Sequence, residues 1–187
     1  MDHNAAPAPD ARSAGPHHGE ALASQAPPSV TNRPRNAGDA WVDGVHGRFW
    51  GRFGAAGVLA FDPDKGVLLQ HRAVWSHYGG TWGLPGGALH EDEDAVTGAL
   101  REAAEEAAVP MNQVDVLFTS VVDLGYWSYS TVVVLVIEPF DPVISDPESI
   151  ELRWIPVAEV SHMALHPGFA SAWAGLRDRM LELAGRQ

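Results

Sequence analysis

Cysteine does not occur anywhere in the 187-residue chain, which excludes disulfides and thiolate metal ligands. Long apolar runs are absent as well, since no stretch reaches the roughly 20 residues that a membrane-spanning helix needs. The N-terminus also lacks the apolar core segment of a secretory signal peptide. These absences give a cytoplasmic location as the default expectation, with no membrane as a partner.

Positive charge is scarce in this sequence. The chain has 12 Lys and Arg residues against 24 Asp and Glu residues, which gives a formal net charge of −12. A chain of this charge has little general attraction for nucleic acid backbones or anionic membrane surfaces, so no nucleic acid partner is expected. A polyphosphate substrate would need bound divalent cations, because these invert the local sign of the potential at the site.

Large apolar side chains are nearly missing from residues 1–40, which are rich in Ala, Pro, Ser, Gly and Asn. Such a segment cannot bury enough surface to offset the entropy that it would lose on ordering. We therefore expect a disordered leader over residues 1–40 and one folded domain over residues 41–187. The hydrophobic fraction of the whole chain, 45%, permits a sizeable core in that domain.

Apolar patterns in the domain predict five strands, a helix that follows Asp94, and a second helix from about residue 167. The strands are expected at residues 53–61, 66–72, 114–122, 130–138 and 150–156. Residues 62–66 (DPDKG) have the composition of a hairpin turn between the first two strands. Residues 131–137 (TVVVLVI) are continuously apolar, which predicts a central strand buried on both faces. Together these elements indicate an α/β fold with a mixed sheet covered on both faces.

The chemistry-bearing stretch runs from Leu84 to Val109 and reads LPGGALHEDEDAVTGALREAAEEAAV. Its helix carries Glu102, Glu105 and Glu106 at spacings that put them close together on the helix surface, with the apolar stripe facing away from Glu102 and Glu105. Clustered like charges repel one another and add nothing to the stability of a soluble helix. Mg²⁺ or Mn²⁺, which prefer oxygen ligands, would explain the arrangement.

The same stretch resembles the signature of the Nudix hydrolases, which cut nucleoside diphosphates linked to another group. The match consists of a glycine, Gly87, then Glu93 after five residues, Arg101-Glu102 after seven more, and Glu105-Glu106 after a further two. Ala103 stands where the family usually has a larger aliphatic residue, and Ala108 stands where it usually has glycine. The resemblance implies a Nudix-type α/β/α sandwich over residues 41–187.

The resemblance also implies roles for the residues of this stretch. Glu102, Glu105 and Glu106 match the metal-binding glutamates of the family, with Mg²⁺ or Mn²⁺ as the cofactor. The backbone carbonyl of Gly86 is a further implied ligand. Glu93 and Arg101 match an internal ion pair that would orient the neighbouring carboxylates; the alternative is a plain surface salt bridge.

The general base and the substrate contacts stay open at this level. In some family members a helix glutamate, here Glu105 or Glu106, activates the water; in others a later acid does so, for which Glu148 is the candidate and Glu151 the competitor. Arg72 matches a position that often contacts phosphate. Trp82 and Tyr126 could contact the base or the ribose, although such aromatic residues more often pack in the core or at the rim.

The implied reaction is hydrolysis of a pyrophosphate linkage in a nucleoside diphosphate derivative. A nucleoside triphosphate, for example oxidised dGTP in nucleotide-pool cleaning, is the favoured small-molecule substrate. The alternatives are a dinucleoside polyphosphate, ADP-ribose, or a non-catalytic Nudix-like ligand sensor. Many members of the family are dimers, so the resemblance also allows a homodimer.

Overall fold

The computed structural model describes residues 37–186. Along the described chain the strands are β1 Trp41–Gly44, β2 Gly47–Trp50, β3 Ala55–Asp62, β4 Gly66–Arg72, β5 Trp82–Gly83, β6 Gly86–Ala88, β7 Val114–Asp123, β8 Ser128–Val136 and β9 Ser149–Ile155. The α-helices are α1 Ala95–Ala107 and α2 Pro167–Ala184, and two short 3-10 turns are η1 Met111–Gln113 and η2 Val160–His162. The predicted leader falls almost entirely outside the described residues.

Seven of these strands form one mixed sheet. The main path runs in the order β5-β4-β3-β8-β7, while β6 pairs with β3 and β9 pairs with β4. Strands β3 and β8 are parallel, and the other pairings are antiparallel. The predicted central strand is confirmed, because β8 lies between β3 and β7 and is buried from Ser130 to Val136.

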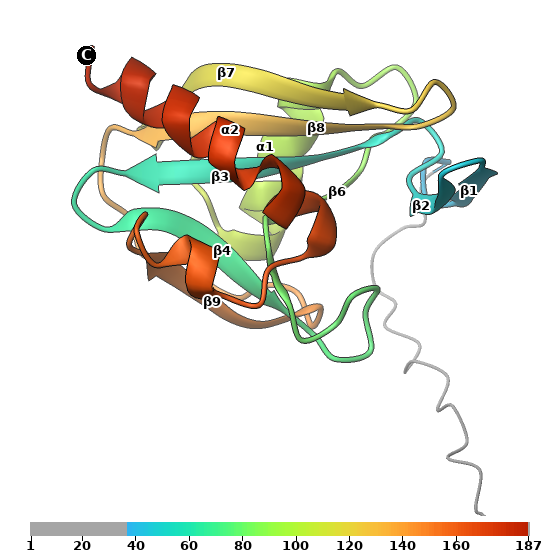
Figure 1. Cartoon of the computed structure of the whole chain (residues 1–187), viewed down its shortest axis with the longest axis horizontal. Helices are drawn as coiled ribbons and strands as arrows, with labels where there is room; N and C mark the ends of the chain where they lie inside the picture. The colour runs from blue at the N-terminus through green and yellow to red at the C-terminus, as the bar shows by residue number, and fades with distance from the viewer. Residues whose placement is uncertain (1–36, 187) are drawn as a thin grey trace, which may run out of the picture.

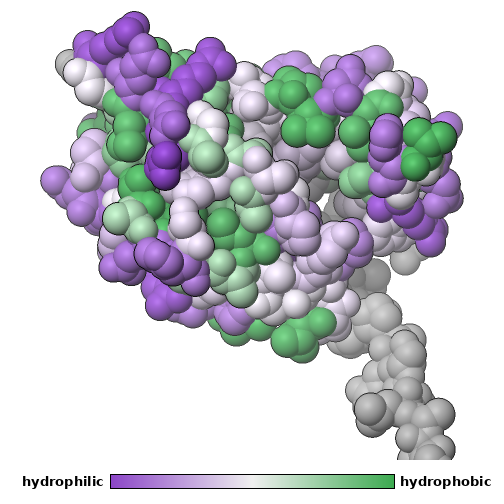
Figure 2. Space-filling model, in the orientation of Figure 1, coloured by the Kyte–Doolittle hydropathy of each residue, from purple (hydrophilic) through white to green (hydrophobic). Residues whose placement is uncertain are grey.

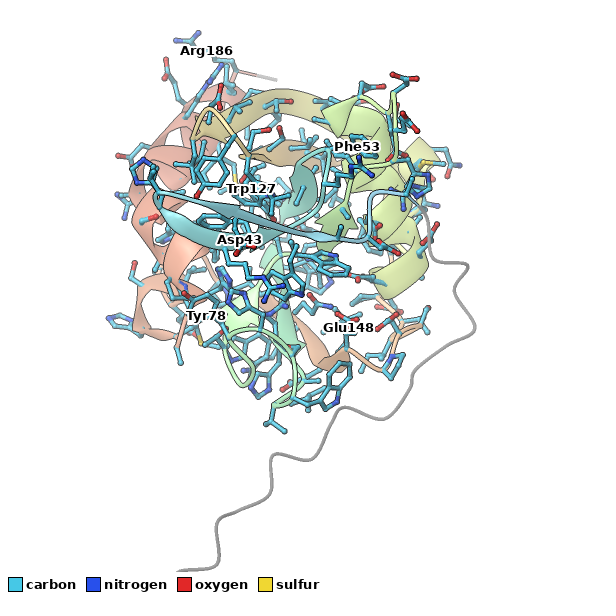
Figure 3. All side chains as sticks on the ribbon, turned by 90° about the vertical axis from the view of Figure 1, so that its right-hand side faces the viewer. Asp43, Phe53, Tyr78, Trp127, Glu148 and Arg186 are labelled. Carbon is cyan, nitrogen blue, oxygen red and sulfur yellow. The ribbon has the colours of Figure 1, made fainter. Side chains whose placement is uncertain are left out.

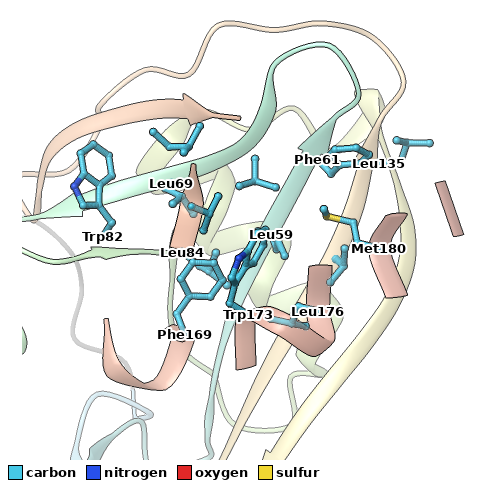
Figure 4. Packing of buried hydrophobic residues seen from close by; sticks show 14 of the residues in the cluster. Leu59, Phe61, Leu69, Trp82, Leu84, Leu135, Phe169, Trp173, Leu176 and Met180 are labelled. Atoms are coloured by element: carbon cyan, nitrogen blue, oxygen red, sulfur yellow. The ribbon is translucent and has the colours of Figure 1, made fainter. Parts of the chain in front are cut away.

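The sheet separates two hydrophobic layers, one under each helix. Side chains alternate across a strand, so Leu59 and Phe61 of β3 face α2 whereas Val58 and Ala60 face α1. The α2 layer contains large aromatic and aliphatic residues, including Trp173 and others labelled in Figure 4. The α1 layer contains the small residues Ala99, Ala103 and Ala107 of α1. The predicted α/β/α sandwich is thus confirmed.

Small side chains under α1 have a consequence for the site, because they allow the helix backbone to approach the sheet closely. Ala103, the first departure from the family pattern, is fully buried in this layer.

The outer face of α2 is mixed in character: Figure 2 shows hydrophobic residues between polar ones, and hydrophilic residues gather at the C-terminal end of the helix. In the part of the chain that the structure describes, no helix is long and apolar enough to cross a membrane.

The turn between β3 and β4 shows why the predicted hairpin forms. The carboxylate of Asp62 accepts hydrogen bonds from the backbone N–H groups of Asp64 (2.9 Å) and Lys65 (3.2 Å). Gly66 has a φ of 97°, a conformation that favours glycine. The five predicted strands agree with β3, β4, β7, β8 and β9 to within two residues at each end.

The short elements β5, β6 and η1 were not predicted. Nor was the β1–β2 hairpin. Its strands pair Trp41 with Trp50 and Gly44 with Gly47, and it forms a separate two-stranded sheet. Aromatic and β-branched residues on either side of the segment from Gly44 to Gly47 were a signal for such a hairpin. In Figure 1 the hairpin lies at one end of the large sheet, beside the start of β3.

Candidate active site

Helix α1 places two of its three glutamates in the interior. Glu102 and Glu106 are 6% and 4% exposed, whereas the side chain of Glu105 is 43% exposed. The expectation that the apolar stripe faces away from Glu102 is wrong, because the close approach of α1 also buries the residues beside the stripe. Glu102 and Glu106 are four positions apart and share a face, while Glu105 is rotated away from Glu106 by about 100°.

Both ends of α1 are defined by local hydrogen bonds. Asp94 caps the N-terminus as predicted, since its side chain accepts from the backbone N–H groups of Val96 and Thr97. At the other end Ala108 adopts the left-handed conformation with a φ of 53°. The N–H of Ala108 donates to Ala104, and the N–H of Val109 donates to Ala103. The helix therefore ends in the usual left-handed geometry even though alanine replaces glycine, at some cost in backbone strain.

The Pro85-Gly86-Gly87 turn packs against the two buried carboxylates. The N–H of Gly86 donates to Oε2 of Glu106 at 3.0 Å. A Cβ atom on Gly87 would lie 2.7 Å from the carboxylate carbon of Glu102, and one on Gly86 would lie 2.3 Å from the carbonyl oxygen of Ala56. A side chain at Gly86 would collide with backbone, and one at Gly87 would displace the carboxylate of Glu102, so the two glycines let the turn bring its backbone next to the acidic groups.

The loop that precedes β9 brings two more acids to Glu106. Its backbone N–H groups at Val143 and Ser145 donate to the carbonyl groups of Ala107 (3.1 Å) and Glu106 (3.2 Å). These carbonyls belong to the last turn of α1, where the carbonyl groups have no hydrogen-bond partners within the helix. Carboxylate oxygens of Glu106, Asp146 and Glu148 consequently lie within 4.8 Å of one another. In Figure 3 Glu148 and Tyr78 both lie below the β1–β2 hairpin, Glu148 to the right and Tyr78 to the left.

This three-carboxylate group has the electrostatics of a cation site. Burial, together with the charges of Glu102, Asp146 and Glu148, raises the pKa of Glu106 to about 8, although the hydrogen bond from the N–H of Gly86 acts in the opposite direction. A buried carboxylate beside other carboxylates is costly unless a positive charge compensates it. Oxygen ligands in this number suit Mg²⁺ or Mn²⁺. The residues present therefore fit a hard divalent cation.

Arg101 forms hydrogen bonds with two glutamates, Glu93 and Glu102. Its Nε and Nη2 atoms each lie 2.8 Å from a carboxylate oxygen of Glu93, and its Nη1 donates to Oε1 of Glu102 at 2.7 Å. The same Nη1 lies 3.8 Å from Glu105. The hydrogen bonds with Arg101 hold the pKa of Glu93 below its usual value. The ion pair expected between Glu93 and Arg101 is present, and its low exposure distinguishes it from an ordinary surface salt bridge.

The structure separates the two candidates for a late acid. Glu148 belongs to the group around Glu106, whereas Glu151 lies within β9 opposite His71 and pairs with Arg153 at 3.5 Å. Asp146 was not singled out from the sequence. Its position two residues before Glu148, in the same loop, was the signal that could have found it.

The predicted substrate contacts lie in three different environments. Arg72 ends β4, and its Nε donates to the carbonyl of His77 at 3.2 Å. Trp82 is 6% exposed, stacks on His71 and lies under the guanidinium of Arg153, so its packing favours the core role. The hydroxyl of Tyr126 donates to the carbonyl of Gly47 at 3.1 Å, which ties the β7–β8 turn to the β1–β2 hairpin. Substrate binding by any of the three residues stays a prediction.

The model of the NUDIX domain family matches residues 51–174 of this chain. This chain belongs to the Nudix hydrolase family. It is accordingly a Nudix pyrophosphohydrolase, and its signature helix is α1.

Two curated relatives and one solved structure resemble the chain over most of its length. A Mycobacterium tuberculosis protein named "Putative 8-oxo-dGTP diphosphatase 3" is 47% identical over 162 residues, covering 81% of this chain and 74% of the relative. A Bifidobacterium longum protein named "Nucleoside triphosphate pyrophosphatase/Nudix hydrolase fusion protein" is 38% identical, covering 96% of this chain but 38% of the relative. The crystal structure of RenU, a Nudix hydrolase from M. smegmatis, is 45% identical with a TM-score of 0.70, covering 78% of this chain and 97% of RenU.

Proposed function

We propose that this Nudix hydrolase cuts the pyrophosphate linkage of a nucleoside triphosphate in a reaction that depends on Mg²⁺ or Mn²⁺, with oxidised dGTP as the first candidate substrate. The observation that carries the proposal is the group of Glu106, Asp146 and Glu148 at the end of the Nudix helix. The choice among nucleotides is supported by the name of the M. tuberculosis relative, an 8-oxo-dGTP diphosphatase.

The cation would be held by carboxylates from two segments. Glu102, Glu105 and Glu106 come from α1, Asp146 comes from the loop before β9, and the carbonyl of Gly86 is the proposed backbone ligand. A divalent ion supplies charge neutralisation at the diphosphate and lowers the pKa of the attacking water. Glu105, which is exposed and near Arg101, would have to turn toward the other carboxylates in order to contribute.

Glu148 is the proposed general base. It is exposed and lies beside Glu106, so it can meet a water molecule at the edge of the site and take its proton. The backbone carbonyl of Glu148 accepts a hydrogen bond from the N–H of Ala73 at 2.7 Å. That bond places the base next to Arg72, whose guanidinium is suited to bind a phosphate group of the substrate.

A dinucleoside polyphosphate is the second candidate substrate. The solved Ap4A hydrolase from C. elegans is 22% identical with a TM-score of 0.57, a likeness that supports only a shared fold. A nucleoside triphosphate therefore remains the favoured substrate. The homodimer and the cytoplasmic location stay predictions from the sequence.

A substrate panel tests the proposal. The purified full chain is assayed with Mg²⁺ against 8-oxo-dGTP, the normal dNTPs, Ap4A and ADP-ribose, and the products are separated by chromatography. We expect 8-oxo-dGTP to have the highest kcat/KM and to yield a nucleoside monophosphate and pyrophosphate. The substrate assignment is wrong if Ap4A or ADP-ribose is cleaved about tenfold more efficiently, with Glu106→Gln as the control for contaminating activity.

A further inference from the structure

A polar side chain lies in the core beside the acidic group. Gln70 is 1% exposed and belongs to β4, where its neighbours Val67, Leu68 and Leu69 are buried apolar residues. Leu68 belongs to the hydrophobic layer under α1. Gln70 is two positions further along the strand and therefore points to the same face of the sheet as Leu68. An amide at such a position costs free energy unless it is hydrogen-bonded.

The amide of Gln70 joins two segments of the site. Its Nε2 donates to Oγ of Ser149 at 2.7 Å and lies 3.4 Å from Oε2 of Glu106. Ser149 is the first residue of β9 and directly follows Glu148. The same Oε2 of Glu106 accepts from the N–H of Gly86. One carboxylate oxygen is thus held by donors from β4 and from the glycine turn.

The orientation of the amide is determined by Oε2 of Glu106, which already accepts a hydrogen bond from the N–H of Gly86. Turning it over would place the amide oxygen against the carboxylate of Glu106, so the N–H₂ group has to face that carboxylate. In this orientation Oε1 of Gln70 is buried and has no hydrogen-bond partner among residues 37–186. An apolar residue of similar volume would avoid this cost, which means that the glutamine is not explained by core stability alone.

We infer that Gln70 is a positioning residue. It holds the Glu106 carboxylate in a fixed position relative to the Asp146–Glu148 loop and thereby sets the geometry of the cation site. The inference rests on the proposed function, since it assumes that these carboxylates bind a divalent cation. The side chain of Gln70 need not touch substrate in this role. It acts through Glu106 and through Ser149.

The test replaces Gln70 by methionine, which has a similar volume but cannot donate a hydrogen bond. Mn²⁺ binding to the full chain without substrate is measured by titration calorimetry, and kcat, KM and Tm are measured on the same samples. We expect Gln70→Met to keep or raise the Tm, to weaken Mn²⁺ binding by about tenfold and to lower kcat, with little change in the KM of the nucleotide. Ser149→Ala should shift Mn²⁺ binding in the same direction by a smaller factor.

Leu68→Met is the matched control, because Leu68 lies on the same face of β4 and has no polar contact with the acids. Methionine for leucine is a tolerated exchange of similar volume, so Mn²⁺ binding and kcat should stay near the values of the unmodified chain. If Gln70→Met binds Mn²⁺ as tightly as the unmodified chain does, the inference is wrong while the proposed function stands. If the unmodified chain itself binds no Mn²⁺, both fail.

Discussion

Replacing Arg101 by methionine should destabilise the fold by more than the loss of an ordinary salt bridge. The side chains of Glu93 and Glu102 are only 10% and 9% exposed, and Arg101 supplies the positive charge that both contact within 2.8 Å. Removing one partner of a buried ion pair costs roughly 3–5 kcal/mol. Because Arg101 itself is 21% exposed, the lower end of this range applies, and we expect the free energy of unfolding to fall by about 3 kcal/mol. For a domain of this size the loss corresponds to a fall in Tm of roughly 6–12 °C.

The measurement is urea denaturation of the full chain at neutral pH and again below pH 4.5. The pKa of Glu93 in the fold is lower than its usual value of 4.5, so the stabilisation from the pair is complete above pH 4.5 and is lost as the pH falls through the lowered pKa. The difference between the unmodified chain and Arg101→Met should therefore shrink in acid.

Arg186→Met is the control for this experiment, because Arg186 pairs with Glu182 on the surface, where both side chains are at least 60% exposed. Arg186→Met should lower the free energy of unfolding by no more than about 1 kcal/mol. Equal losses in the Arg101 and Arg186 variants, or a loss for Arg101→Met that does not change with pH, would contradict the role given to Arg101.

Four further outcomes are expected. Glu106→Gln should lower turnover by at least about 100-fold while leaving the Tm unchanged or higher, because a neutral amide avoids the cost of ionising a buried carboxyl group; nearly full turnover would exclude Glu106 from the site. Glu148→Gln should lower kcat by about 100-fold and Glu151→Gln should leave it near normal, and the reverse order in the same assay would move the general base to Glu151. Chelation with EDTA should abolish hydrolysis and added Mg²⁺ or Mn²⁺ should restore it, so activity that survives chelation would refute the metal dependence. Burial, with the nearby charge of Arg72, lowers the pKa of His166 to about 4 from a usual 6.5. The stability of the fold should therefore fall as the pH drops from 6.5 toward 4. His166→Gln should flatten that part of a curve of Tm against pH.

Several features of the fold could be predicted because their signals are local. The Asp62–Gly66 turn, the Asp94 cap and the continuous apolar run of β8 each depend on residues that are neighbours in the sequence. The β1–β2 hairpin was missed although its pattern is also local, since its turn consists of only two residues and its strands of four each. Elements this short give little periodicity to detect.

The burial of the glutamates could not be predicted from the helix alone. Periodicity separates the apolar face of α1 from its charged face, and this separation predicted that Glu102 would face away from the core. How far the glutamates beside the apolar face are buried depends on how closely the helix approaches the sheet. The alanines of α1 and the glycines of the Pro85–Gly87 turn set that distance.

The sequence by itself determined the family, the class of fold and the presence of an acidic helix that calls for a cation, because each depends on residue types at fixed spacings. Only the tertiary structure decided which acids meet. Asp146 and Glu148 reach Glu106 because their loop donates to the last carbonyls of α1, and Gln70 reaches it from β4. Contacts between segments that lie 36 or more residues apart depend on the packing of the whole sheet, which no spacing within one segment encodes.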